Sequence, residues 1–177
     1  LKDSKYTEAK ENFQQYNQLE ENNKHTDRYF DALIRLADCY MILKNYEDAL
    51  KNYEQIIVYG QQETDYALYQ KAIILGLQNK DDEKLNTLVT LKDKYPTSTY
   101  SDDAAFEIAN IYFLGSKYAM ALEKFTSFTT NYPRSPYVIA SILKIGLCNY
   151  NMGNDDLALE QLKDIITKYP YSGEAKE

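Results

Sequence analysis

The sequence lacks most of the residues on which catalysis and metal binding depend. Its 177 residues include one histidine, His25, two cysteines, Cys39 and Cys148, and no tryptophan. His25 has no cysteine or histidine beside it to share a metal ion, and no glycine-rich phosphate loop is present. We therefore expect no catalytic residue, no metal site and no cofactor, and we predict that the chain is not an enzyme.

Long apolar runs and basic clusters are missing as well. A membrane-spanning helix needs roughly 20 consecutive apolar residues, and the chain has no such run. The formal net charge is -7, and acidic residues are spread over the whole length, so a phosphate backbone finds no basic stripe. These absences predict no direct membrane insertion by this segment and no nucleic acid partner.

Prolines and glycines are few, four and six respectively, which leaves few turns for a β-rich fold. Tyrosine, in contrast, occurs 18 times. Three Tyr-Pro doublets begin at Tyr95, Tyr132 and Tyr169, at intervals of 37 residues, and each is followed two residues later by a serine. A fixed period of this length predicts a stack of similar structural units.

Apolar residues between the doublets follow a helical period, so we expect each unit to be a helix, a short turn and a second helix. Gly115-Ser116 and Gly153-Asn154 mark two of these turns. Ser135 is expected to cap a first helix, with Pro136 as its first residue. The predicted helices cover residues 5–19, 27–43, 46–59, 64–78, 81–94, 100–114, 117–131, 136–151 and 154–168.

The predicted fold is all-α, a right-handed superhelical solenoid of antiparallel helix pairs. We expect a single array cut at both ends, whose truncated ends stack artificially. Residues 1–25 would supply the second helix of a truncated repeat, residues 26–62, 63–98, 99–135 and 136–170 four repeats, and residues 171–177 the start of a next one.

Small residues recur where two helices should cross closely, and large ones where a gap should be filled. The small residues are Ala37, Ala72, Ala109 and Gly146, and the large ones are Tyr53, Leu88, Phe125 and Leu162. The third unit departs from this pattern with Lys71 and Lys84. These lysines either mark a hinge or a partner-specific face, or they extend their ammonium groups to water over a looser helix crossing. We expect the second of these arrangements.

This pattern resembles the tetratricopeptide repeat (TPR) family, whose motif asks for residues of these kinds at these places. The fourth unit supplies Ala105, Ile108, Ala109, Tyr112, Ala121, Phe125, Phe128 and Pro133. The fifth supplies Ile142, Ile145, Gly146, Asn149, Ala158, Leu162, Ile165 and Pro170, with Asn149 where an aromatic residue is usual.

The phrase Tyr-Pro-x-Ser-x-Tyr, at residues 95–100 and 132–137, is similar to TPR repeats of bacterial outer-membrane assembly lipoproteins and Tol-Pal-associated periplasmic proteins. The resemblance implies an envelope scaffold, in the periplasm or at the periplasmic face of the outer membrane. Cys39 and Cys148 lie three repeats apart, too far for a disulfide. We expect both to be buried, and two unpaired thiols favour the alternative of a reducing, cytoplasmic compartment.

First helices line the inner face of such a solenoid, and we expect this first-helix face to bind another protein or peptide. Its aromatic residues would anchor the partner, and Asn110 would bond a backbone amide. The first-helix face consists of Asp38, Met41, Tyr66, Tyr69, Ile73, Phe106, Asn110, Phe113, Leu147 and Tyr150.

Three alternatives remain open at this point. Six large side chains of the first helices either contribute to the first-helix face or pack between adjacent first helices: Ile34, Phe106 and Leu143, for which we expect packing, and Tyr69, Phe113 and Tyr150, for which we expect the face. Four acidic residues either attract a basic partner or stabilise the starts of helices as capping residues that complement the helix dipole: Asp31, Asp38, Asp102 and Asp103. The chain is either a protein-interaction scaffold, our leading hypothesis, or a regulatory or sensory segment of a larger multidomain protein.

Overall fold

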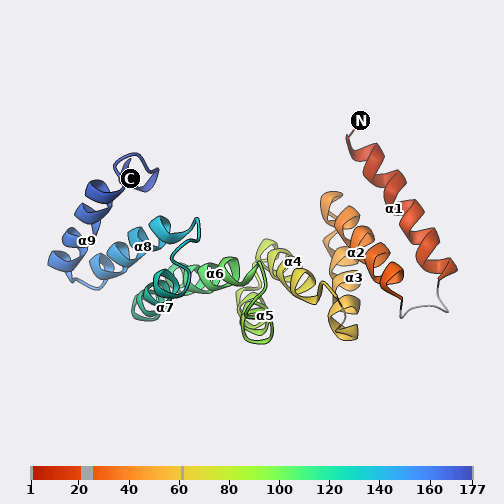
Figure 1. Ribbon diagram of the computed structural model, residues 1–177, viewed down its shortest axis with the longest axis horizontal. Helices are drawn as coiled ribbons and strands as arrows, with labels where there is room; N and C mark the ends of the chain where they lie inside the picture. The colour runs from red at the N-terminus through yellow and green to blue at the C-terminus, as the bar shows by residue number, and fades with distance from the viewer. Residues whose placement is uncertain (1, 21–25, 61, 177) are drawn as a thin grey trace. The chain divides into compact units, whose positions relative to one another are not determined.

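The computed structural model describes residues 2–20, 26–60 and 62–176, and all regular secondary structure in these ranges is helical (Figure 1). The predicted helix ranges agree with the observed bounds to within three residues. The elements are α1 (Lys2–Leu19), α2 (Asp27–Ile42), α3 (Tyr46–Tyr59), α4 (Thr64–Leu77), α5 (Asp81–Lys94), α6 (Ser101–Leu114), α7 (Tyr118–Asn131), α8 (Val138–Asn151), α9 (Asp155–Lys168) and a short 3-10 helix, η2 (Glu174–Lys176).

The chain forms two compact units, Leu1–Thr87 and Leu88–Glu177, which we call unit 1 and unit 2. In unit 1, α1 packs on α2, α2 on α3 and α3 on α4. In unit 2, α6 packs on α7, α7 on α8 and α8 on α9. Packing between consecutive helices confirms the predicted all-α fold of helix pairs.

Four turns from a first helix to a second helix share one backbone geometry. The second residue after the first helix has a positive φ: 59° at Lys44, 57° at Asn79, 58° at Ser116 and 78° at Gly153. The next backbone N–H donates to a carbonyl five residues earlier, over 2.9 Å in all four turns. This bond satisfies a carbonyl left without a partner at the helix end. Only Gly153 takes this conformation without the steric cost of a Cβ atom.

The Tyr-Pro-x-Ser-x-Tyr phrase forms the turn that joins one helix pair to the next. Ser135 donates its N–H to the carbonyl of Tyr132 over 3.0 Å, and its Oγ accepts from the N–H of Tyr137 over 3.3 Å. The equivalent bonds of Ser98 measure 3.0 and 3.1 Å. The prediction that Ser135 caps a helix beginning at Pro136 is therefore wrong, because this turn delays the start of α8 until Val138.

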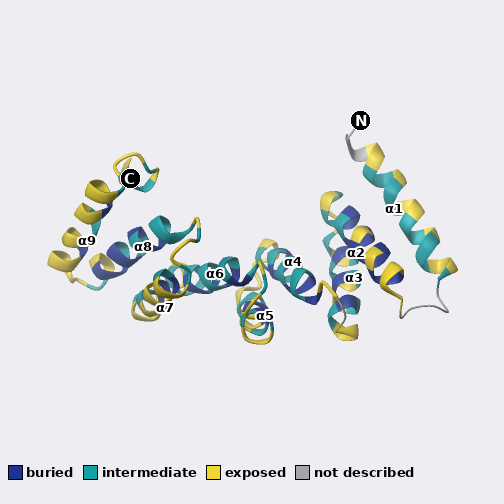
Figure 2. Ribbon diagram, viewed as in Figure 1, coloured by how far each residue is buried: buried dark blue, intermediate teal, exposed yellow. Residues whose placement is uncertain are grey.

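Most of the small and large residues predicted at the helix crossings lie in the cores of both units, among the buried residues coloured dark blue in Figure 2. Ala37, Ala109, Tyr53 and Phe125 are all fully buried. A Cβ atom added to Gly146 would lie 3.0 Å from Cδ2 of Leu162, closer than ordinary van der Waals contact. The predicted close crossings are therefore confirmed at these positions.

The structure also places the two lysines that depart from the repeat pattern and the two cysteines. Lys71 extends to Glu54 on α3, with 2.7 Å between Nζ and Oε1, and the stem of Lys84 lies across Gly76. Cys39 and Cys148 are free and buried, as expected. Burial raises the pKa of the Cys148 thiol to about 11, so this sulfur is a protonated, unreactive group near neutral pH.

Candidate protein-interaction surface

In unit 1, Asp38 joins three helices. Its Oδ1 accepts hydrogen bonds from the phenols of Tyr53 on α3, over 2.6 Å, and of Tyr66 on α4, over 2.8 Å. The two rings meet edge to face at 6.2 Å. Burial and the bond to Asp38 raise the pKa of the Tyr53 phenol far above its ordinary value. One oxygen of Asp38 is thus engaged in holding α2, α3 and α4 together.

The other unit 1 residues of the first-helix face are half-buried. Met41 and Tyr66 pack against the main apolar core of the unit, and Tyr69 and Ile73 keep part of their surface accessible. Ile34 is 5% exposed, so it packs in the core, as one of the two alternatives proposed. Asp31 is exposed and pairs with Arg35 one turn along α2.

In unit 2, Phe106 is held by other aromatic rings. It stacks on Tyr137 with 4.6 Å between ring centroids, and it meets Phe125 in a T-shaped arrangement with 5.8 Å between centroids. The Tyr137 phenol donates to Oδ1 of Asp103 over 2.8 Å, and this bond raises the pKa of Tyr137. Phe106 is half-buried, and Leu143 is buried. Phe106 and Leu143 therefore fit the packing alternative, and Asp103 is engaged in joining α6 to the turn before α8.

The first-helix face around Phe113 in unit 2 ranges from half-buried at Phe113 to exposed at Tyr150. The Nζ of Lys144, on α8, lies 4.3 Å from the centroid of the Phe113 ring on α6, a cation–π contact that joins two first helices. Leu147 follows one turn after Lys144 and is half-buried. Tyr150, one turn further, is 63% exposed. These residues present a mixed aromatic, aliphatic and cationic surface.

Lys144 was missed by the sequence prediction. It lies on the same helix as Leu147, but nothing in its local sequence indicates a partner on α6, because that contact depends on how α6 and α8 pack. Asn110, the predicted backbone-binding amide, donates a long hydrogen bond of 3.4 Å to Glu107 on its own helix. Such a weak bond leaves the amide able to exchange partners.

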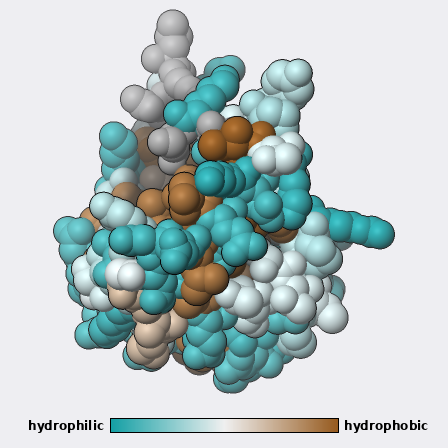
Figure 3. Space-filling view, turned by 90° about the vertical axis from the view of Figure 1, so that its left-hand side faces the viewer, coloured by the Kyte–Doolittle hydropathy of each residue, from teal (hydrophilic) through white to brown (hydrophobic). Residues whose placement is uncertain are grey.

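The face drawn in Figure 3 is mainly hydrophilic, with hydrophobic side chains in separate patches. Within the described ranges, no helix has both the length and the apolar character needed to cross a membrane. The same residues contain no group of three or more metal-ligating side chains. His25 lies outside the described residues.

Comparisons with known proteins connect this architecture to a family. Residues 31–59, 66–98, 103–135 and 140–172 match the tetratricopeptide repeat, and together they cover well over half of the chain. No curated protein sequence matches the chain.

Solved structures show the same fold. A tetratricopeptide repeat protein from Parabacteroides merdae has a TM-score of 0.73 at 16% identity, covering 94% of this chain and 61% of that chain. MamA has a TM-score of 0.66 at 18% identity, covering 93% and 92%. YrrB, described as a TPR protein with an unusual peptide-binding site, has a TM-score of 0.64 at 17% identity, covering 97% and 95%. The chain belongs to the tetratricopeptide repeat family.

Proposed function

We propose that this chain is a non-catalytic scaffold that binds a segment of another protein on its first-helix face. The surface around Phe113, Lys144, Leu147 and Tyr150 is the observation that carries the proposal. Tyr150 exposes 63% of its surface, and Lys144 holds its charge over the Phe113 ring. Accessible aromatic rings are the usual anchors of a bound peptide, because they bury a large apolar area at low entropic cost.

The partner that this surface suits is an extended or helical segment with apolar side chains. Tyr150 and Phe113 offer rings to such side chains, and the Asn110 amide offers a hydrogen bond to the partner's backbone. YrrB shares the fold and is described as having a peptide-binding site, which supports a peptide as ligand without locating the site here. In unit 1, Tyr69 and Ile73 on α4 provide half-buried surface at the positions that Phe106 and Asn110 occupy in α6.

For the cellular setting we propose the bacterial envelope, in the periplasm or at the periplasmic face of the outer membrane. The Tyr-Pro-x-Ser-x-Tyr phrases at residues 95–100 and 132–137 support this setting. The two free thiols support a cytoplasmic alternative, although both are buried, and burial protects them from oxidation. Fractionation of the source cells with an antibody against the chain separates the two settings, because recovery with cytoplasmic markers alone excludes the envelope.

Affinity capture from a lysate of the source cells tests the binding face. We compare the chain with a variant in which Tyr69, Phe113 and Tyr150 are changed to alanine, and we expect the variant to lose partner proteins that the chain retains. The matched control changes three exposed apolar residues outside the first helices, Val58, Leu159 and Tyr171, to alanine. Equal recovery by all three proteins, each folded by circular dichroism, would rule out the first-helix face as the binding site.

A further inference from the structure

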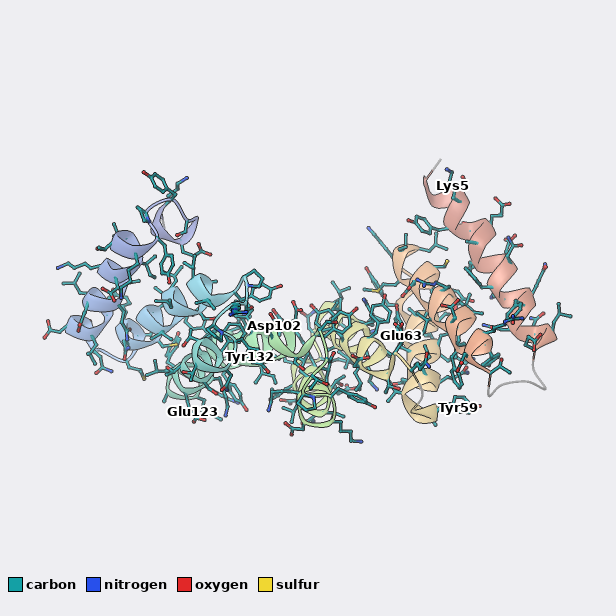
Figure 4. All side chains as sticks on the ribbon, in the orientation of Figure 1. Lys5, Tyr59, Glu63, Asp102, Glu123 and Tyr132 are labelled. Atoms are coloured by element: carbon teal, nitrogen blue, oxygen red, sulfur yellow. The ribbon has the colours of Figure 1, made fainter. Side chains whose placement is uncertain are left out.

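A second candidate site lies in unit 2 on residues outside the first-helix face. A pocket of 550 Å³ opens between the last part of α5, α6 and α7. Its floor is apolar, since Ile108 and Phe128 are buried there. We call it the Ala105 pocket, and its lining is Val89, Lys92, Asp93, Pro96, Ala105, Ile108, Tyr112, Lys124, Ser127, Phe128, Asn131 and Tyr132, the last of which is labelled in Figure 4.

The sequence explains why this space is open. Ala105 precedes the small crossing residue Ala109 by four positions, and the same position in the other repeats carries Leu33, Leu68 and Ile142. Leu33 and Leu68 are almost fully buried. An alanine has three carbon atoms fewer than a leucine, so it leaves unfilled the volume that the larger side chains take up.

Unit 1 holds the repeat-equivalent pocket, which makes a comparison within one chain possible. That pocket, over Leu33, lies between α1, α2 and α3 and measures 290 Å³. Its walls carry Asn17 and Asn52 where the Ala105 pocket carries Lys92 and Lys124. The pocket in unit 2 is the larger of the two, and it has two cations at positions where the unit 1 pocket has two amides. Counting the other charged lining residues, Asp48 and Lys51 balance in unit 1, whereas Lys92 and Lys124 outnumber Asp93 in unit 2.

Both lysines of the Ala105 pocket are able to take a new partner. Lys92 pairs with Asp93 over 2.8 Å, and Lys124 pairs with Glu123 over 2.9 Å. In each case the acid is the adjacent residue, and both side chains are more than a third exposed. Such surface pairs contribute little, so a ligand carboxylate competes with them readily.

We propose that the Ala105 pocket binds a segment of a partner protein that carries a large apolar side chain beside a carboxylate. The apolar side chain would lie on Ile108 and Phe128 in the space left by Ala105, and the carboxylate would pair with Lys92 or Lys124. The pocket volume falls within the range of about 300–1,000 Å³ typical of ligand sites. Because the whole chain carries a charge of -7, most of its surface repels an acidic segment, which favours binding at this lysine pair.

Titration with defined peptides, followed by NMR amide shifts of the labelled chain, tests the proposal. The probe is the blocked peptide Asp-Glu-Leu-Glu-Asp, and two controls replace its leucine with serine or its acids with lysine. We expect saturable shifts at the Ala105 pocket with the probe alone. Absence of saturable shifts there, or equal binding of the serine peptide, overturns the proposal.

Variants that convert this pocket into its unit 1 counterpart locate the site. Ala105→Leu fills the space and should weaken probe binding by about tenfold, the effect of losing one buried apolar side chain, without lowering the midpoint of thermal unfolding. Lys92→Asn with Lys124→Asn leaves the core untouched and should weaken binding similarly. Unchanged affinity in both variants refutes the site. The Tyr69, Phe113 and Tyr150 alanine variant should bind the probe normally, which separates this proposal from the first-helix face.

Discussion

Replacing Asp38 with alanine tests whether this carboxylate holds unit 1 together. The change removes the acceptor of two phenol hydrogen bonds, at 2.6 Å from Tyr53 and 2.8 Å from Tyr66. Tyr53 is fully buried, so its hydroxyl cannot turn to water, and an unsatisfied buried donor costs about 1–3 kcal/mol. Tyr66 is half-buried and recovers a water partner, so its loss is about 0.5 kcal/mol. We expect the free energy of unfolding to fall by about 1.5–3.5 kcal/mol.

Urea denaturation followed by circular dichroism measures this loss, and a double-mutant cycle assigns it. In the Tyr53→Phe background the buried donor is absent, so Asp38→Ala should cost about 1–2 kcal/mol less than in the unmodified chain. The conservative change Asp38→Asn keeps an acceptor and should cost less than Asp38→Ala. A loss below about 0.5 kcal/mol for Asp38→Ala, or zero coupling to Tyr53, would refute the structural role and leave Asp38 available for a partner.

Three further predictions concern stability and reactivity. The pKa of Tyr53 is raised in the folded chain, so above pH 10 the unfolded chain loses the phenol proton while the folded chain keeps it. The free energy of unfolding should therefore fall as pH rises, by up to about 1.4 kcal/mol per pH unit. Tyr53→Phe should reduce that slope in urea titrations at alkaline pH. Ala109→Leu inserts three carbon atoms at a fully buried crossing and should lower the unfolding free energy by about 1–3 kcal/mol, whereas an unchanged thermal midpoint would contradict the helix register. Lys44→Gly relieves a positive φ and should raise the unfolding free energy by about 0.5–1 kcal/mol, measured against Lys51→Gly, which lies inside α3 and should destabilise.

The candidate site could be predicted from the sequence only in part. The first-helix pattern selected Tyr150, whose ring is exposed, but it selected Phe106 and Phe113 equally, which are half-buried and contact Tyr137 and Lys144 respectively. The pattern assigns a residue to one face of a helix, whereas accessibility depends on what the next repeat places over that face. Lys144 was not selected, because its contact with Phe113 joins residues that lie 31 positions apart in the chain.

Local prediction also failed at one helix start. Serine followed by proline is a strong signal for the beginning of a helix, which favoured Ser135 and Pro136. The chain instead uses Ser135 in a turn with Tyr132 and Tyr137, and the same turn recurs at Ser98. The Tyr-Pro-x-Ser-x-Tyr phrase occurs twice in the chain, and this repetition indicated that both copies adopt the same backbone geometry. That geometry is a turn that links one helix pair to the next.

The helices and their order follow from local sequence patterns, because helical periodicity depends on residues only three or four positions apart. The 37-residue interval added the repeat architecture, since equal spacing places equivalent residues at equivalent crossings. Tertiary structure alone decided that Asp38 binds two phenols on other helices, and that the missing side-chain volume at Ala105 opens a pocket beside Lys92 and Lys124. These features depend on side chains brought together from separate helices, and their distances are set by packing, which no local pattern encodes.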